Sequence, residues 1–103
     1  MNITHSPSQL SLSKPFPTQW TALHYAAVNN PSAVPILLEA NAEVNVMDGG
    51  NQSPLFYAAR NNYREAVIAL CAAGADPHLG YSPLTSNHIS EEMKNLIKEQ
   101  LSL

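Results

Sequence analysis

The side chains of this chain that are best suited to chemistry are one cysteine, Cys71, and four histidines. A thiol beside an imidazole can act as a nucleophile, and cysteines and histidines at short intervals can bind zinc. Cys71 stands in an apolar segment, where a thiol more often packs than reacts. His5, His78 and His88 show no metal-ligand spacing with one another or with Cys71. We therefore expect neither a catalytic residue nor a metal site.

Binding of phosphate, calcium or nucleic acid is also not expected from the composition. The sequence contains no glycine-rich phosphate loop, and we expect no cofactor. Asp48 and Asn51 share a turn sequence, but one carboxylate supplies too few oxygens for a usable calcium site. Five basic residues against eight acidic ones give a formal net charge of −3, and the basic residues are scattered. Because nucleic-acid binding needs a basic patch, we expect no nucleic-acid partner.

No membrane partner is expected either. The longest apolar run, residues 34–38, contains Pro35 and is far too short to span a bilayer. The first twenty residues show no basic region followed by an apolar stretch, so we see no signal peptide. A single cysteine suits a reducing compartment. We expect a cytoplasmic protein, and delivery into another cell by a system that reads no signal peptide stays open.

Two similar hexapeptides, TALHYA and SPLFYA, indicate the elements that would position these side chains. They begin at Thr21 and Ser53, whose hydroxyl groups can cap a helix N-terminus, and Pro54 suits a first helical position. An Ala-rich segment, a polar turn and a second apolar segment follow each hexapeptide. In the first unit Ser32 is the expected N-cap of the second helix, which places Pro35 in the first helical turn. Asn41 and Gly74 stand where a second helix would end in the left-handed conformation. The sequence therefore predicts two helix–turn–helix units.

These units resemble the ankyrin repeat, which has a period of about 33 residues and a first helix that begins T-P-L-H-x-A. The matching residues are Thr21, Ala22, Leu23, His24 and Ala26, then Ser53, Pro54, Leu55 and Ala58, with a later Gly74-Ala75-Asp76. The resemblance covers about residues 19–101 and implies a structural role for His24. It implies an all-α fold, a short ankyrin-repeat solenoid of helix-turn-helix units. One full β-hairpin finger is expected around residues 45–52 and one shortened finger around 77–81.

The predicted domain spans residues 19–103. A final amphipathic helix, capped by Ser90, is expected to belong to a degenerate capping repeat. Residues 1–18, rich in Ser and Pro, are either a flexible tail or an N-terminal cap that covers the first repeat. The expected units are repeat 1 at about 19–51, repeat 2 at 52–81 and the capping repeat at 82–103.

By the same resemblance, the fingers and the exposed side of the first helices line a groove that binds other proteins. Met47 is an adaptable apolar side chain at a turn, which either anchors a partner or folds back against the finger. Trp20 either packs against the repeat or forms one wall of the groove. The candidate partner-binding residues are Met47, Asp48, Asn51, Gln52, Val28, Asn29, Arg60, Asn61, Tyr81 and Trp20.

The sequence thus favours a non-catalytic protein–protein interaction module, an adaptor or an inhibitor, that binds another protein through the finger and the groove. A structural or self-associating module within a larger assembly is the alternative, because fewer than three full repeats bury little surface. An enzyme would need a site that the motifs do not show. The net charge of −3 favours a basic partner surface only weakly.

Overall fold

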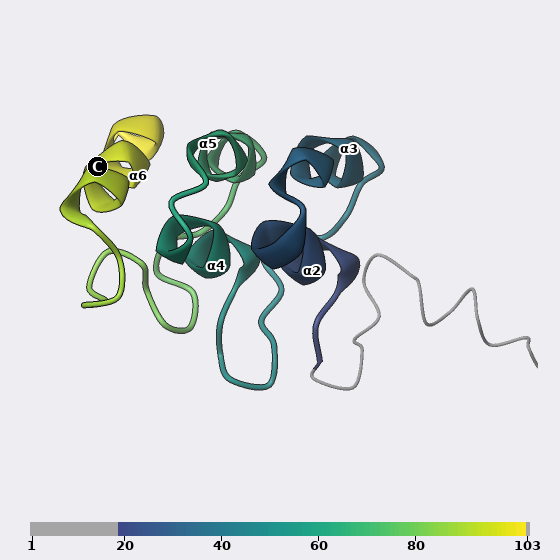
Figure 1. The fold of residues 1–103 in the computed structure, drawn as a ribbon, viewed down its shortest axis with the longest axis horizontal. Coiled ribbons are helices and arrows are strands. Elements are labelled where there is room, and N and C mark those ends of the chain that lie inside the picture. Colours follow the sequence, from purple (N-terminus) through teal and green to yellow (C-terminus); the bar gives the residue numbers. More distant parts are fainter. Residues whose placement is uncertain (1–18, 103) are drawn as a thin grey trace, which may run out of the picture.

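The computed structural model describes residues 19–102, so the tail or cap predicted for residues 1–18 lies outside the described residues. Its helices form two layers, with α3, α5 and α6 side by side in one layer and α2 and α4 in the other (Figure 1). Neighbouring units contact each other through both layers, as a solenoid requires. The elements are α2 Ala22–Asn29, η1 Pro31–Ala33, α3 Val34–Glu39, α4 Pro54–Arg60, α5 Arg64–Ala72 and α6 Glu91–Leu101.

Three hydroxyl side chains start the helices as the sequence predicts. The side chain of Thr21 accepts a hydrogen bond from the backbone of His24 at the start of α2. Ser53 caps α4 in the same way, with Pro54 in the first turn. Ser90 caps α6, where two acidic residues in the first turn interact favourably with the helix dipole. These bonds satisfy backbone N–H groups that have no partner within the helix.

The second helix of the first unit begins differently from the prediction. Its sequence suggests Ser32 as the N-cap, but the hydroxyl of Ser32 donates to the side chain of Asn30 instead. A short 3-10 turn, η1, leads directly into α3, and no side chain caps α3. Pro35 lies in the first turn of α3, as expected, where it removes no intrahelical hydrogen bond. The left-handed positions predicted after the second helices are confirmed, with φ 67° at Asn41 and 95° at Gly74.

The core lies between the two layers. Small side chains of α2 and α4 allow the inner helices to approach closely, and larger ones from α3, α5 and α6 fill the space between the layers. Cys71 is buried in this core, and burial raises the pKa of its thiol to about 11. Buried residues include Ala26, Ala27, Ala58 and Ala59 of the inner helices, and Val34, Val67, Leu70, Met93 and Ile97 of the outer ones.

The last unit lacks an inner helix. Residues 82–90 form turns, and α6 packs against α5 with only a smaller contact to α4. We refer to residues 77–90 as the second loop and to residues 45–52 as the finger. In Figure 1 the connections that contain the finger and the second loop extend from the same side of the helices. The boundaries of the individual repeats stay a prediction.

The finger is closed by a hydrogen-bonded turn rather than by assigned strands. The backbone N–H of Asp48 donates to the carbonyl of Gln52 at 2.9 Å, and that of Asn51 donates to the carbonyl of Asp48 at 3.1 Å. The second loop joins the finger where Tyr81 N–H donates to the Asn51 carbonyl at 2.8 Å. Residues 19–102 contain no assigned strand, so the β-hairpin character of the finger stays a prediction. No helix within this range is long and apolar enough to cross a membrane.

Candidate functional site

The carboxylate of Asp48 organises the finger from within. Only 7% of Asp48 is exposed, and its Oδ1 accepts hydrogen bonds from the backbone N–H groups of Gly50 and Gln52, each at 2.9 Å. Its Oδ2 accepts from the indole Nε1 of Trp20 at 2.9 Å and from the hydroxyl of Tyr57. Four donors from three segments of the chain therefore converge on one side chain. Asp48, predicted as a partner contact, is directed into the protein.

The protonation states in this cluster follow from its hydrogen bonds. Burial acts to raise the pKa of Asp48, but the bonds from Tyr57, Gln52, Gly50 and Trp20 outweigh it and hold that pKa below its ordinary value. Burial and the bond to Asp48 raise the pKa of Tyr57 to about 12. Asp48 is thus the ionised acceptor and Tyr57 the neutral donor, a charge-assisted pair that fixes the base of the finger to α4.

Trp20 packs as one member of an aromatic cluster at the start of α2. Its ring meets Tyr25 edge-on with 4.8 Å between centroids, and meets Tyr57 in a similar way at 5.3 Å. It lies roughly parallel to His24 at 6.4 Å. Edge-to-face contacts at these distances are favourable beyond the area that they bury. Trp20 is half-buried, so it both packs against the repeat and borders the surface.

His24 connects the first helix to the end of the finger. Its ring is fully buried, and Nδ1 accepts from the backbone N–H of Thr21 at 3.0 Å. The other nitrogen, Nε2, then carries the proton and donates to the carbonyl of Gln52 at 3.0 Å. Burial lowers the pKa of His24 despite this hydrogen bond, which favours the neutral ring. These contacts give His24 the structural role that the resemblance implies.

Four of the predicted partner-binding residues lie together where the finger meets the second loop. Met47 is 37% exposed and Tyr81 is 58% exposed. Asn51 is exposed and accepts from the Tyr81 backbone, and Gln52 is half-buried beside them. Gly80 lies so close that a Cβ there would overlap the Asn51 carbonyl and the Met47 sulfur. We call Met47, Asn51, Gln52 and Tyr81 the finger surface.

The other four lie at the opposite end of the inner helices. Val28 and Asn29 close α2, and Arg60 closes α4 with Asn61 just beyond it. Val28 is half-buried, and its carbonyl accepts from the Tyr63 hydroxyl at 3.2 Å. The side-chain amide of Asn61 donates to the Tyr57 carbonyl at 2.9 Å and so caps the end of its own helix. These residues are not part of the finger surface.

A hollow of about 420 Å³ lies between α4 and the second loop, at the edge of the finger surface. It occupies a region where the last unit has turns instead of an inner helix. The sequence signal for this hollow is the decay of the repeat pattern after Ser82. Of the residues that line it, only Gln52 and Tyr81 were predicted as site residues. We call it the α4 hollow; its lining includes Gln52, Phe56, Tyr81, Ser82, Ser86 and His88.

A second hollow, of about 610 Å³, lies between the turn before α3 and the start of α5. Its lining is mostly apolar and includes Pro31, Pro35 and Tyr63. It contains no residue of the finger surface. Within the part of the chain that the structure describes, no group of three or more His, Cys, Asp or Glu residues could hold a metal ion.

Comparison with known proteins gives the family. Residues 3–80 match the family model for ankyrin repeats in three copies. Over 61 residues, 57% of this chain and 10% of the relative, the sequence is 43% identical to the palmitoyltransferase Hip14 of Drosophila melanogaster. Over 78 residues, 73% of this chain and 8% of the relative, it is 37% identical to the nuclear factor NF-kappa-B p105 subunit of Gallus gallus.

The chain spans a tenth or less of the length of these two relatives, so neither relative's activity is transferred to it. The family-model match nevertheless covers more than half of the chain. It agrees with the paired helices, the capped starts of α2 and α4, and the buried His24. The chain belongs to the ankyrin repeat family.

Proposed function

We propose that this chain is a non-catalytic adaptor or inhibitor that binds a protein partner through its finger and the side of the inner helices next to it. Ankyrin repeats generally mediate protein–protein interaction. The observation that carries the proposal is the finger surface, where two large apolar side chains, Met47 and Tyr81, are exposed together. Adjacent exposed apolar side chains with a polar border are typical of sites that contact other proteins.

The network around Asp48 supports this proposal because it holds the finger in one conformation before a partner arrives. The carboxylate fixes the backbone of the finger, and its bonds to Trp20 and Tyr57 fix the finger to α2 and α4. A surface that is ordered in advance loses less conformational entropy on binding. In this proposal Asp48 and Trp20 position the finger surface. Met47, Asn51, Gln52 and Tyr81 contact the partner.

The predicted residues at the far ends of the inner helices extend the proposed surface. Val28, Asn29, Arg60 and Asn61 lie at the ends of α2 and α4, and a partner that extends from the finger along these helices would contact them. We propose a protein partner rather than nucleic acid or a membrane, on the grounds of the scattered basic residues and the short apolar segments. A cytoplasmic setting is part of the same proposal, since the single cysteine suits a reducing compartment.

The experiment is an affinity capture from a lysate of the source cells with three forms of the chain. The test variant carries Met47→Ala and Tyr81→Ala. The control carries Ile36→Ala, which truncates an apolar side chain that is 66% exposed on the outer helix α3. Circular dichroism first establishes that all three forms are helical. The proposal expects one protein retained by wild type and control and lost by the test variant. Equal retention by all three forms would place the binding surface elsewhere.

Self-association is the second candidate, and Ile36 is the observation that favours it. A large aliphatic side chain that is mostly exposed on α3 offers a contact for a second copy of the chain. Sedimentation velocity at several concentrations of wild type and of Ile36→Ala tests this candidate. A dimer that forms with rising concentration in wild type but not in the variant would support it. A monomer at every concentration would exclude it.

A further inference from the structure

The charged side chains of residues 19–102 are distributed unevenly between the two layers. Every acidic residue except Asp48 lies on an outer helix or in the segment just after α3 or α5. The protein is therefore negative on its outer side, although its net charge is only −3. These outer acids are Glu39, Glu43, Glu65, Asp76, Glu91, Glu92 and Glu99.

The side formed by α2, α4, the finger and the second loop is bordered by one exposed carboxylate, Asp76, which accepts from the His78 backbone N–H. No exposed carboxylate lies in α2, in α4 or in the lining of the α4 hollow. The acid of the finger, Asp48, is buried and already accepts four hydrogen bonds. The same side carries the exposed residues Arg60, His78 and His88. No ion pair joins Arg60 to another described residue. The α4 hollow thus lacks the negative charge that the net charge of the chain suggests.

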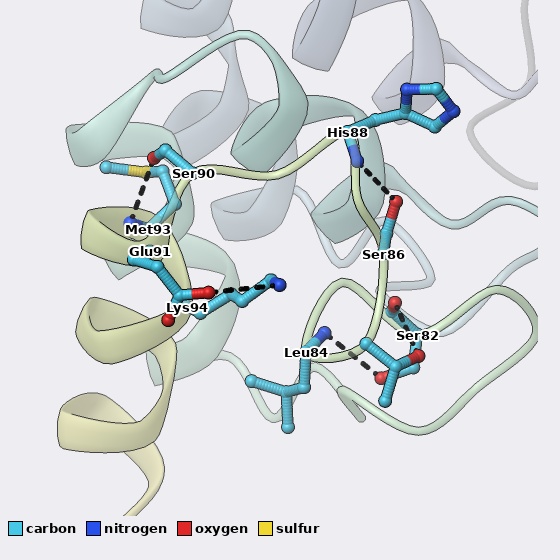
Figure 2. Close-up of polar contacts among 9 residues, drawn as sticks. Ser82, Leu84, Ser86, His88, Ser90, Glu91, Met93 and Lys94 are labelled. Carbon is cyan, nitrogen blue, oxygen red and sulfur yellow. Dashed lines mark hydrogen bonds and ion pairs between the residues drawn. The ribbon is translucent and has the colours of Figure 1, made fainter.

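The α4 hollow presents hydrogen-bond donors that the described residues leave unused. The Gln52 side chain contacts the Tyr57 hydroxyl, whose single hydrogen is donated to Asp48, so Gln52 is not counted among these donors. The Tyr81 hydroxyl and the His88 ring have no hydrogen-bond partner within residues 19–102. Figure 2 shows the His88 ring projecting from the second loop, away from Glu91 and Lys94 of α6.

The hydroxyl of Ser86 adds a third donor at the same hollow. Its oxygen accepts from the His88 backbone N–H at 3.0 Å, a bond drawn in Figure 2, and its hydrogen stays free to donate. Phe56 forms an apolar part of the lining, and Arg60 follows it by four positions on α4. Residues four apart lie on the same face of a helix, so Arg60 follows Phe56 on the same face of α4, one turn away.

We propose that the partner binds as an acidic segment, one of whose Asp or Glu side chains enters the α4 hollow. An ionised carboxylate only accepts hydrogen bonds, so it matches the donors of Tyr81, Ser86 and His88. Arg60 attracts the same segment along α4, and the lining of the hollow contains no carboxylate that would repel it. This inference rests on the proposed function, because it specifies the chemistry of the partner that the finger surface binds.

The test uses a library of random twelve-residue peptides displayed on phage and selected on the immobilised full chain. Selected peptides are synthesised with a fluorescent label, and their dissociation constants are measured by fluorescence anisotropy. We expect the peptides to be enriched in Asp and Glu. Changing the critical Glu or Asp of a peptide to its amide should weaken binding about tenfold, because a hydrogen bond to a charged group contributes about 1.5–3 kcal/mol. Arg60→Ala and His88→Ala should each raise the dissociation constant of the acidic peptide. Neither substitution should change the dissociation constant of the amide analogue.

Arg64→Ala is the matched control, because it removes an exposed arginine from the outer helix α5. It should leave the dissociation constant unchanged. Peptides that lose binding to Met47→Ala/Tyr81→Ala but show no preference for acids would overturn the acidic segment and leave the proposed function standing. Selected peptides that bind this double variant as well as wild type would overturn both. A selection that enriches no peptide would also count against both.

Discussion

The indole nitrogen of Trp20 lies 2.9 Å from Oδ2 of Asp48, a residue 28 positions further along the chain. This bond connects the start of the first inner helix to the turn of the finger. The hydroxyl of Tyr57 donates to the same carboxylate oxygen from α4. One carboxylate therefore holds the finger against two successive units. The position of the finger surface depends on a buried charge that is fully hydrogen-bonded.

Asp48→Asn should destabilise the protein more than its small change in shape suggests. The amide offers one oxygen where the carboxylate offers two, so at least one buried donor loses its partner. We expect the free energy of unfolding to fall by about 2 kcal/mol, as is typical when a hydrogen bond to a charged group is lost. Urea denaturation followed by the fluorescence of Trp20, the only tryptophan, measures this change.

Asp76→Asn is the control for this measurement. Asp76 is exposed, and one of its oxygens accepts a single bond from the His78 backbone at 2.9 Å, which the amide oxygen of Asn can replace. It should change the free energy of unfolding by less than about 0.5 kcal/mol. Equal losses for the two variants would contradict a special role for Asp48.

The stability of the protein should fall as the pH drops below 6.5, the ordinary pKa of a histidine. Burial lowers the pKa of His24 in the folded state, so in this window the unfolded chain binds a proton that the folded chain does not. The contribution of neutral His24 to stability is therefore present above pH 6.5. It is lost as the pH falls toward the pKa of His24 in the folded state. Urea unfolding curves at a series of pH values from 7.5 to about 5 measure it.

Two glutamine variants separate His24 from the other histidines in this experiment. His24→Gln should lower the free energy of unfolding at pH 7.5, because the contacts with Thr21 and Gln52 are altered, and should show a flatter decline toward low pH. His88→Gln removes an exposed histidine and should keep the pH dependence of wild type. A decline that is the same in His24→Gln as in wild type would show that another group causes it.

Gly80→Ala should destabilise the contact between the finger and the second loop. Gly80 has φ 61°, where a residue with a side chain costs about 1–2 kcal/mol. Its new Cβ would also overlap the carbonyl oxygen of Asn51 and the sulfur of Met47. The backbone oxygen cannot move away without disturbing the finger. We expect a loss of more than about 1 kcal/mol in thermal or urea unfolding.

Gly50→Ala provides the comparison for Gly80. A Cβ at Gly50 would lie 3.6 Å from Asp48 Oδ1 and 3.7 Å from Gln52 Oε1, which are ordinary contact distances. Its φ is outside the positive range in which side chains are strained. The expected change is within about 0.5 kcal/mol. If Gly80→Ala changed the free energy of unfolding as little as Gly50→Ala, the close contact between the finger and the second loop would be contradicted.

The helices could be predicted from the sequence because their signals are local. The caps at Thr21 and Ser53 and the left-handed Asn41 and Gly74 depend on residues within one or two turns. The N-cap suggested at Ser32 was wrong for a related reason. The hydroxyl of Ser32 bonds to Asn30 within the turn. A serine before a helix can bond either to the turn or to the helix backbone, and the sequence does not show which bond forms.

The direction of the Asp48 side chain could not be predicted in the same way. A turn sequence of Asp followed by glycines indicates an exposed loop, and nothing local shows that Trp20 and Tyr57 reach it from other units. The α4 hollow was missed for a different reason. The decay of the repeat after Ser82 was visible, but a missing helix shows neither which side chains line the space nor that His88 projects beside it.

Calorimetric titration of the captured partner measures directly whether the finger surface binds a protein. Wild type, Met47→Ala and Ile36→Ala are titrated under the same conditions. The two variants remove similar apolar side chains from opposite layers. We expect Met47→Ala to raise the dissociation constant at least fivefold, about 1 kcal/mol, and Ile36→Ala to leave it unchanged. A loss of affinity for Ile36→Ala, with no loss for Met47→Ala, would show that the partner binds the outer layer and not the finger surface.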